Sequence, residues 1–290
     1  MVNPLENLSF EISISPLISA EELLTLKSSP DLILIDARSS KDAENNYNQQ
    51  HLANALFAPL EYCWSAPVIN AREGGRHPLP SFSDLQKTAE KLGIHPNSKI
   101  VIYDDQNSAM AAARAWWVLT SAGHPSVQVI NGGLSAAIKV GYPVESQTPP
   151  LPAPGSWIPS SWELPMEELK DILENPSSSR HPLMDVRDAD RYRGEREPID
   201  PIAGHIPGAF NLPYTELFTE EGYFHSKDIL QNKIRNTIPH PVDSVRVHCG
   251  SGVTAAVMVL AFAYLNNTIP HLYVGSWGEW CRNDLPIATR

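Results

Sequence analysis

The chain has 290 residues, of which 42% are hydrophobic and 19% charged, so it is long and apolar enough to bury two domain cores and is not a disordered polymer. Its formal net charge of −11 at pH 7 disfavours nucleic acid and anionic membrane surfaces as partners. The sequence contains no apolar run that could cross a bilayer and no signal-peptide pattern at its start, so we expect no membrane association and no leader.

The three cysteines, Cys63, Cys249 and Cys281, fit neither a zinc motif nor a disulfide framework, because their spacing is irregular and their number is odd. Thiols that stay reduced are typical of the cytosol. We therefore expect a cytoplasmic protein.

Along the first half of the chain, short apolar runs alternate with helical patterns. The β-branched run 100–103 and the run 127–130 predict strands, and the apolar segment 109–119 between them predicts a helix. Such alternation favours a mostly parallel sheet covered by helices, with a site at the carboxyl ends of the strands.

The second half repeats the first. Four segment pairs recur in the same order about 145 residues apart: 32–38 with 182–187, 51–55 with 205–209, 100–104 with 245–249, and 130–134 with 273–277. A proline-rich stretch at 147–155 lies between the halves and predicts an extended linker. We expect a domain over 1–145, a linker over 146–162 and a second domain over 163–290.

The most informative segment is a cysteine loop, Val247-His248-Cys249-Gly250-Ser251-Gly252-Val253-Thr254-Ala255. The cysteine ends a predicted strand, and the apolar run 255–265 after the loop predicts a buried helix. Free backbone N–H groups and the positive end of the helix dipole favour a thiolate in such a loop. A cysteine phosphatase is disfavoured, because Ala255 stands where that chemistry needs an arginine. The remaining alternative is a cysteine that packs as a small hydrophobe.

The loop 249–254 and the segments 204–209 and 275–277 resemble the rhodanese superfamily, in its two-domain 3-mercaptopyruvate and thiosulfate sulfurtransferase form. The resemblance implies an α/β fold of two tandem rhodanese-like domains, each a mostly parallel sheet flanked by helices. It implies an enzyme that carries sulfur as a persulfide on Cys249 and needs no metal or organic cofactor. Asp104 stands at the cysteine position of the first half, so the N-terminal domain is expected to be non-catalytic and to wall one side of the cleft.

The resemblance also implies roles for individual residues. Cys249 would be the nucleophile, and Ser251 would relay protons with His77 and Glu61, although the family usually has an aspartate as the acid. Arg191 matches the arginine that binds the donor anion. Backbone N–H groups of the loop would stabilise the sulfur anion, namely those of Gly250, Ser251, Gly252, Val253 and Thr254.

One family feature is missing. Mercaptopyruvate enzymes usually carry a second arginine shortly after the Arg191 motif, where this chain has Glu197-Pro198-Ile199-Asp200-Pro201. Arg193 and Arg196 are candidates for a replacement. The gap keeps thiosulfate open as the donor. Ser251 favours 3-mercaptopyruvate instead, because thiosulfate enzymes usually have basic residues in this part of the loop.

We therefore expect a sulfurtransferase that takes sulfur from a small anionic donor, 3-mercaptopyruvate before thiosulfate. The acceptor would be a thiol, a thioredoxin-like protein or cyanide, and the enzyme would be a monomer. A persulfide carrier without turnover is a more distant alternative.

Other conspicuous residues have structural interpretations. His51 and His205 occur in both halves, which favours shared architecture over catalysis. Asp36 and Asp185 follow strands in both halves and are expected to cap turns or helices. We expect core packing for four tryptophans and no role in catalysis for two cysteines: Trp116, Trp117, Trp277, Trp280, Cys63 and Cys281.

Overall fold

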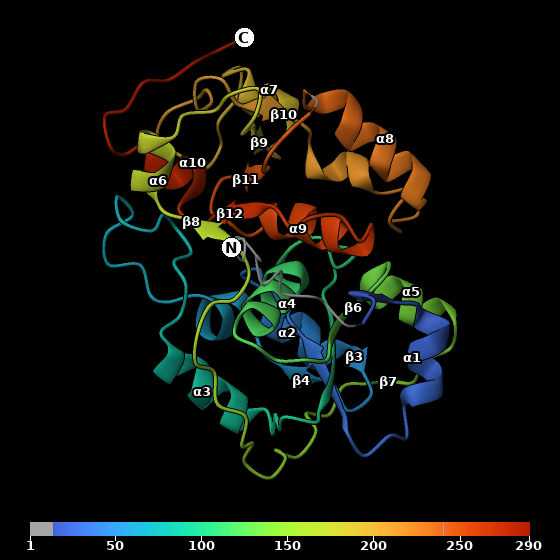
Figure 1. Ribbon diagram of the computed structural model, residues 1–290. Helices are drawn as coiled ribbons and strands as arrows, with labels where there is room; N and C mark the ends of the chain where they lie inside the picture. The colour runs from blue at the N-terminus through green and yellow to red at the C-terminus, as the bar shows by residue number, and fades with distance from the viewer. Residues whose placement is uncertain (1–13, 240) are drawn as a thin grey trace, which may run out of the picture.

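The computed structural model describes residues 14–239 and 241–290. Its two halves lie one against the other, with the first half below and the second above in Figure 1. Each half contains a five-stranded sheet whose strands are all parallel. The first sheet has the order β1-β6-β5-β2-β4 and the second the order β8-β12-β11-β9-β10. The two orders correspond strand for strand, which confirms the predicted duplication and the α/β fold class.

The strands are short, and the central ones carry most of the apolar side chains. The first sheet contains β1 (Leu17–Ile18), β2 (Leu32–Asp36), β4 (Leu56–Phe57), β5 (Lys99–Tyr103) and β6 (Val127–Ile130). The second contains β8 (Met166–Glu167), β9 (Leu183–Asp185), β10 (Phe210–Asn211), β11 (Arg246–His248) and β12 (His271–Tyr273). An antiparallel pair, β3 (His51–Leu52) and β7 (Val144–Glu145), lies beside the first sheet.

Helices flank both sheets. The first half has α1 (Ala20–Leu26), α2 (Ala43–Gln49), the π-helical turn η1 (Leu60–Trp64), α3 (Phe82–Lys91), α4 (Ala111–Ser121) and α5 (Gly133–Lys139). The second has α6 (Leu169–Glu174), α7 (Ala189–Tyr192), the 3-10 turn η2 (Tyr214–Leu217), α8 (Lys227–Thr237), α9 (Ala255–Tyr264) and α10 (Ser276–Trp280). Serine hydroxyls cap the starts of two helices, as Ser19 accepts from Glu22 N–H before α1 and Ser81 from Asp84 N–H before α3.

The two domains are joined by a shared apolar core. Helix α4 packs against α9, and both lie at the centre of the molecule in Figure 1. Nine of the ten residues of α9 are buried, as its nearly uniform apolar sequence predicts. A single hydrophobic cluster includes Trp117 of α4 and Val257 of α9. The domain interface is therefore a packed core, and it holds the two sheets in a fixed relation.

The linker lies along the first domain. Backbone N–H groups of Gly155 and Trp157 donate to the carbonyls of Glu90 and Ile94, at 2.9 and 3.0 Å.

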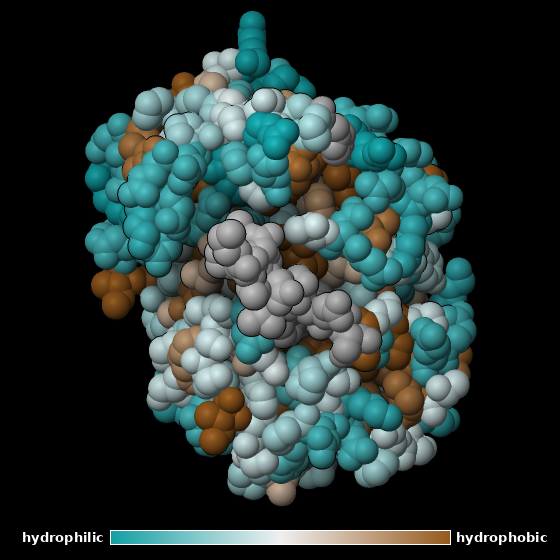
Figure 2. Space-filling model, in the orientation of Figure 1, coloured by the Kyte–Doolittle hydropathy of each residue, from teal (hydrophilic) through white to brown (hydrophobic). Residues whose placement is uncertain are grey.

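The face shown in Figure 2 is mainly hydrophilic, with apolar side chains in separate patches. Across residues 14–239 and 241–290, no helix has the length and apolar character that a membrane span requires.

Duplicated residues have duplicated roles. His51 and His205 each stack on a tyrosine and bond through Nδ1 to its carbonyl, at 2.7 Å from Tyr47 and Tyr192 respectively. The structural interpretation of both histidines is therefore confirmed. All four tryptophans named above are buried, as predicted.

The turn-capping role predicted for Asp36 and Asp185 is confirmed, because their carboxylates accept from the backbone N–H groups of Arg38 at 3.1 Å and Arg187 at 2.9 Å. Each aspartate also forms a buried ion pair with the same arginine, at 2.7 Å for Asp36 and 2.6 Å for Asp185. The arginine two residues after each aspartate reaches back to it, because the chain turns directly after the strand.

Candidate active site

Cys249 lies where the sequence predicts it, between β11 and α9. Its side chain is buried, and the Ser251 N–H donates to its sulfur at 3.4 Å. The backbone of Cys249 is fixed by the Ser276 hydroxyl, which accepts from its N–H at 3.2 Å, and by the Trp277 N–H, which donates to its carbonyl at 3.0 Å. Gly252 has a φ of +72°, a conformation that strains other residues.

The equivalent loop of the first domain is built around a carboxyl group, that of Asp104. The Asp104 carboxylate accepts four backbone hydrogen bonds, from Gln106 at 2.8 Å, Ser108 at 2.8 Å, Ala112 at 3.0 Å and Met110 at 3.2 Å. Burial raises the pKa of Asp104, and these four bonds act in the opposite direction because they favour the charged form. This loop shape gathers backbone N–H groups around one acceptor, and the Cys249 loop is its duplicate.

His77 contacts the active-site loop from the other domain. Its Nδ1 lies 2.8 Å from the Ser251 hydroxyl. Burial, together with the positive charges of Arg76 and Arg114, lowers the pKa of His77 to about 4. The ring is therefore neutral at physiological pH and can accept the hydroxyl proton.

Glu61 lies near this pair but has its own partner. It is on η1, and its carboxylate accepts a hydrogen bond from the Ser39 hydroxyl. Its negative charge acts to raise the pKa of His77, against the larger effects of burial and the two arginines. Glu61 therefore influences His77 through its charge, and the hydrogen-bonded chain Ser251–His77–Glu61 stays a prediction.

Arg191, on α7, lies beside the loop, as a donor-binding residue would. A methyl group built on Gly250 would lie 3.5 Å from its Nη2. Two hydrogen bonds to Glu197, at 2.7 and 3.2 Å, hold the guanidinium. The two candidate replacements for the missing arginine have surface partners instead, since Arg193 pairs with Glu195 at 2.8 Å and Arg196 with Asp190 at 2.6 Å.

Arg114 is a site residue that sequence reasoning missed. It is fully buried on α4 and donates to three carbonyls, those of His77 at 3.0 Å, Gly252 at 3.2 Å and Trp64 at 3.4 Å. Burial lowers its pKa to about 10, and the charge of a Cys249 thiolate acts to raise it. No carboxylate within the described ranges forms a salt bridge with it. A lone arginine in the apolar run 109–119 was the available signal, because a buried charge needs partners.

Arg76 and Asp200 were also missed. Arg76 Nη2 lies 2.8 Å from a methyl group built on Gly250, and its guanidinium bonds to Asp200 at 2.9 and 3.3 Å. Arg76 directly precedes His77, a predicted site residue, and this position in the sequence was the signal that could have identified Arg76. Asp200 lies in the segment 197–201, which the sequence analysis considered only for its missing arginine.

The other two cysteines are poor nucleophiles. Burial raises the pKa of Cys63 to about 11, and burial also raises the pKa of Cys281. All three cysteines are free thiols. At neutral pH the two side chains are protonated, which fits the expectation that they take no part in catalysis.

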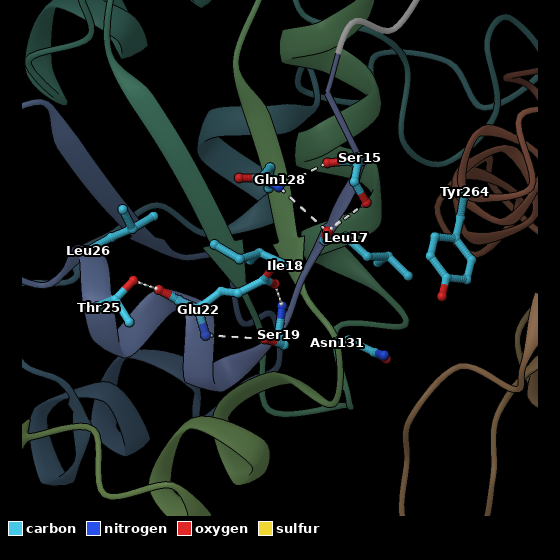
Figure 3. A pocket seen from close by; sticks show the side chains of 10 residues that line it. All are labelled: Ser15, Leu17, Ile18, Ser19, Glu22, Thr25, Leu26, Gln128, Asn131 and Tyr264. Carbon is cyan, nitrogen blue, oxygen red and sulfur yellow. Dashed lines mark hydrogen bonds between the residues drawn. The ribbon is translucent and has the colours of Figure 1, made fainter.

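A surface hollow beside β1 and α1 is separate from the candidate site. It has a volume of about 520 Å³, and Figure 3 shows its lining, from Ser15 and Glu22 to Tyr264. Its polar groups largely bond to one another, as in the Ser19–Glu22 cap and the bond from Gln128 to the Ser15 carbonyl at 2.9 Å. Within 14–239 and 241–290, no cluster of three or more His, Cys, Asp or Glu side chains is arranged to hold a metal ion.

Comparison with known proteins identifies the family. The Rhodanese-like domain family matches the chain twice, over residues 19–139 and 165–283, so the chain belongs to this family. It is 36% identical to a probable 3-mercaptopyruvate sulfurtransferase of Pseudomonas aeruginosa, across 96% of this chain and 99% of that protein. It is also 36% identical to a putative thiosulfate sulfurtransferase of Mycobacterium tuberculosis, across 91% and 93% respectively.

Among solved structures, a 3-mercaptopyruvate sulfurtransferase from Leishmania major superposes with a TM-score of 0.81 at 28% identity, covering 93% of this chain and 75% of that one. The resemblance seen in the sequence, the fold of two rhodanese-like domains and the sulfurtransferase class are thereby confirmed. The two donor names occur at equal identity, so similarity does not choose between donors.

Proposed function

We propose that this enzyme takes sulfur from 3-mercaptopyruvate and passes it to an acceptor through a persulfide on Cys249. One observation carries the choice of donor: a neutral His77 bonds to the Ser251 hydroxyl, two residues from the cysteine. A hydroxyl beside a neutral base can move a proton, and only the mercaptopyruvate reaction needs a proton at carbon.

In the first half-reaction the Cys249 thiolate attacks the thiol sulfur of 3-mercaptopyruvate. A sulfur–sulfur bond forms and the carbon–sulfur bond breaks, and its electron pair leaves on carbon as the enolate of pyruvate. The proton of the donor thiol balances the step, because its transfer to the enolate gives pyruvate and leaves a persulfide anion. Ser251 and His77 are the groups proposed to carry that proton.

The persulfide anion then needs the same stabilisation as the thiolate. The Ser251 N–H at 3.4 Å and the positively charged Arg114 beside the loop support this role. The Asp104 loop supports it further, since the duplicate of this loop holds a carboxylate through four N–H groups. An acceptor thiol or cyanide attacks the outer sulfur and returns the thiolate, which is covalent catalysis in two steps.

Thiosulfate is the second candidate donor. Attack on its outer sulfur releases sulfite and leaves the same persulfide, with no proton transfer. Two guanidinium groups beside Gly250, those of Arg191 and Arg76, could bind its sulfonate end. We propose Arg191 as the residue that grips the carboxylate of one donor or the sulfonate end of the other.

The acceptor is proposed to be a small thiol, a thioredoxin-like protein or cyanide. Three free cysteines support a reducing, cytoplasmic setting. We propose a monomer, because both domains needed for the site come from one chain.

A steady-state comparison of the two donors tests the proposal. We expect a higher kcat/KM for 3-mercaptopyruvate than for thiosulfate with the same acceptor, and stoichiometric pyruvate release. A strong preference for thiosulfate would contradict the donor assignment and leave the persulfide chemistry standing.

A further inference from the structure

Two guanidinium groups lie over the active-site loop, one from each domain. A methyl group built on Gly250 would lie 2.8 Å from Nη2 of Arg76 and 3.5 Å from Nη2 of Arg191. Arg76 belongs to the segment between η1 and α3 of the first domain, whereas Arg191 is on α7 of the second. Cys249 directly precedes Gly250, so the anionic end of a donor bound at the sulfur is within reach of both.

Asp200 orients the Arg76 side chain, and it has a second arginine partner of its own. Its carboxylate accepts from Arg76 at 2.9 and 3.3 Å and from Arg282 at 2.8 Å, and Arg191 Nη2 lies 3.7 Å away. If Arg76 turned toward a donor, Asp200 would keep Arg282, so no buried carboxylate would be left unpaired. Four guanidiniums meet three carboxylates in this network, because Glu197 pairs with Arg191 and with Arg187, and Arg187 also pairs with Asp185. One positive charge is left for an anion.

The segment that carries Arg76 is fixed to the catalytic domain. The Gly74 N–H donates to the Glu279 carboxylate at 2.7 Å. Gly75 has a φ of +74° and packs so closely that a methyl group on it would lie 2.4 Å from the Gly275 carbonyl oxygen. This docking places the Arg76 side chain over the loop by backbone contacts, which makes it a preorganised binding group.

We propose that Arg76 is the second residue that binds the anionic end of the sulfur donor, supplied by the N-terminal domain in place of the arginine missing after Arg191. The inference rests on the proposed sulfurtransferase function. Donor recognition is then shared between the domains, since Arg191 comes from the second domain and Arg76 from the first. It gives the domain without a nucleophile a direct part in binding.

The test compares Arg76→Gln with Arg72→Gln, a control on the same segment whose exposed side chain pairs with Asp284 at 3.4 Å. The donors are 3-mercaptopyruvate and the neutral 1-mercapto-2-propanone, which keeps the reacting thiol and ketone and lacks the carboxylate. We expect Arg76→Gln to raise the KM for 3-mercaptopyruvate about tenfold, the effect of one lost charge-assisted hydrogen bond, with little change in kcat. The neutral donor is expected to show no such increase, and Arg72→Gln none with either donor.

Arg76→Lys keeps the charge without the forked geometry, and its KM is expected between those of the wild type and Arg76→Gln. This variant also covers the case in which Arg76→Gln folds poorly. An unchanged KM for 3-mercaptopyruvate in Arg76→Gln, or equal losses with charged and neutral donors, would overturn the inference. Failure of the proposed function looks different, because the wild type would then form no Cys249 persulfide with saturating donor.

Discussion

His77 Nδ1 and the Ser251 hydroxyl lie 2.8 Å apart and belong to different domains, so one hydrogen bond joins the two halves of the duplication two residues from the candidate nucleophile. Through this contact the N-terminal domain places a side chain at the active site, although Asp104 stands in its own loop where the second domain has the cysteine. The proposed proton relay uses Ser251 and the proposed sulfur attack uses Cys249. Substitutions at these two residues can therefore test the two steps separately.

Ser251→Ala is expected to lower kcat/KM for 3-mercaptopyruvate by about a hundredfold, the usual size of a lost proton-transfer group. Thiosulfate turnover is expected to change far less, since sulfite leaves without a proton at carbon. Ser251→Lys should move the preference toward thiosulfate. Both variants can be followed by pyruvate and sulfite release, and equal losses on the two donors in Ser251→Ala would remove the basis for the relay.

The acid side of the pH profile tests the state of His77. Its folded pKa of about 4 is below the ordinary value of 6.5, so the unfolded chain takes up this proton first as the pH falls. The stability contributed by neutral His77 is complete above pH 6.5 and is lost as the pH falls toward 4. We expect His77→Asn to lack this loss in denaturant titrations at pH 7 and pH 5.

The same shift predicts how turnover depends on pH. Because His77 stays neutral until about pH 4, it should impose no acid limb near pH 6.5 on kcat/KM for 3-mercaptopyruvate. A limb near pH 6.5 in the wild type that disappears in His77→Asn would show that the ring titrates normally.

Arg114 is expected to act through Cys249 as a buried positive charge that favours the thiolate. Arg114→Met should lower the rate of Cys249 alkylation at pH 7 by about tenfold. Arg114→Lys keeps the charge and should retain more of the rate. Identical alkylation profiles in the wild type and Arg114→Met, both folded by circular dichroism, would exclude this electrostatic role.

The docking of the Arg76 segment can be tested at a glycine. Gly75→Ala adds backbone strain at a φ of +74° and a methyl group 2.4 Å from the Gly275 carbonyl oxygen. Gly141→Ala is a matched control, because its φ of +81° gives similar strain while the methyl group meets nothing within 4 Å.

We expect the control to lose about 1 kcal/mol of stability and to keep its activity. Gly75→Ala should lose more stability, and its KM for donor should rise because Arg76 and His77 are displaced. Equal stability and equal KM in the two variants would mean that the docking has no role.

Much of the fold was predictable because the signals are local. The run 127–130 forms β6 with the predicted bounds, and the run 255–265 forms α9 to within one residue. The repeated segments identified the duplication, and the loop after Val247 located Cys249. Each of these depends on neighbours in sequence, which a pattern can record.

The rest of the site depends on how the domains pack. Arg76 and Gly250 are more than 170 positions apart in sequence, since 250 − 76 = 174, and no spacing rule joins them. Arg114 reaches Gly252 only because α4 packs against α9. Arg193 and Arg196 lie nearer to Arg191 in sequence, but nearby surface carboxylates hold them. The replacement for a missing charge came from another domain, which a one-dimensional comparison with the family could not indicate.

The central claim is that Cys249 carries the sulfur, and intact-mass analysis after donor treatment tests it most directly. The wild type, incubated with 3-mercaptopyruvate and no acceptor, should gain one sulfur atom that peptide mapping places on Cys249. Cys249→Ser should gain none and keep its fold, because an alcohol is a far weaker nucleophile at neutral pH. Added sulfur on Cys63 or Cys281 instead, or turnover that survives in Cys249→Ser, would contradict the account.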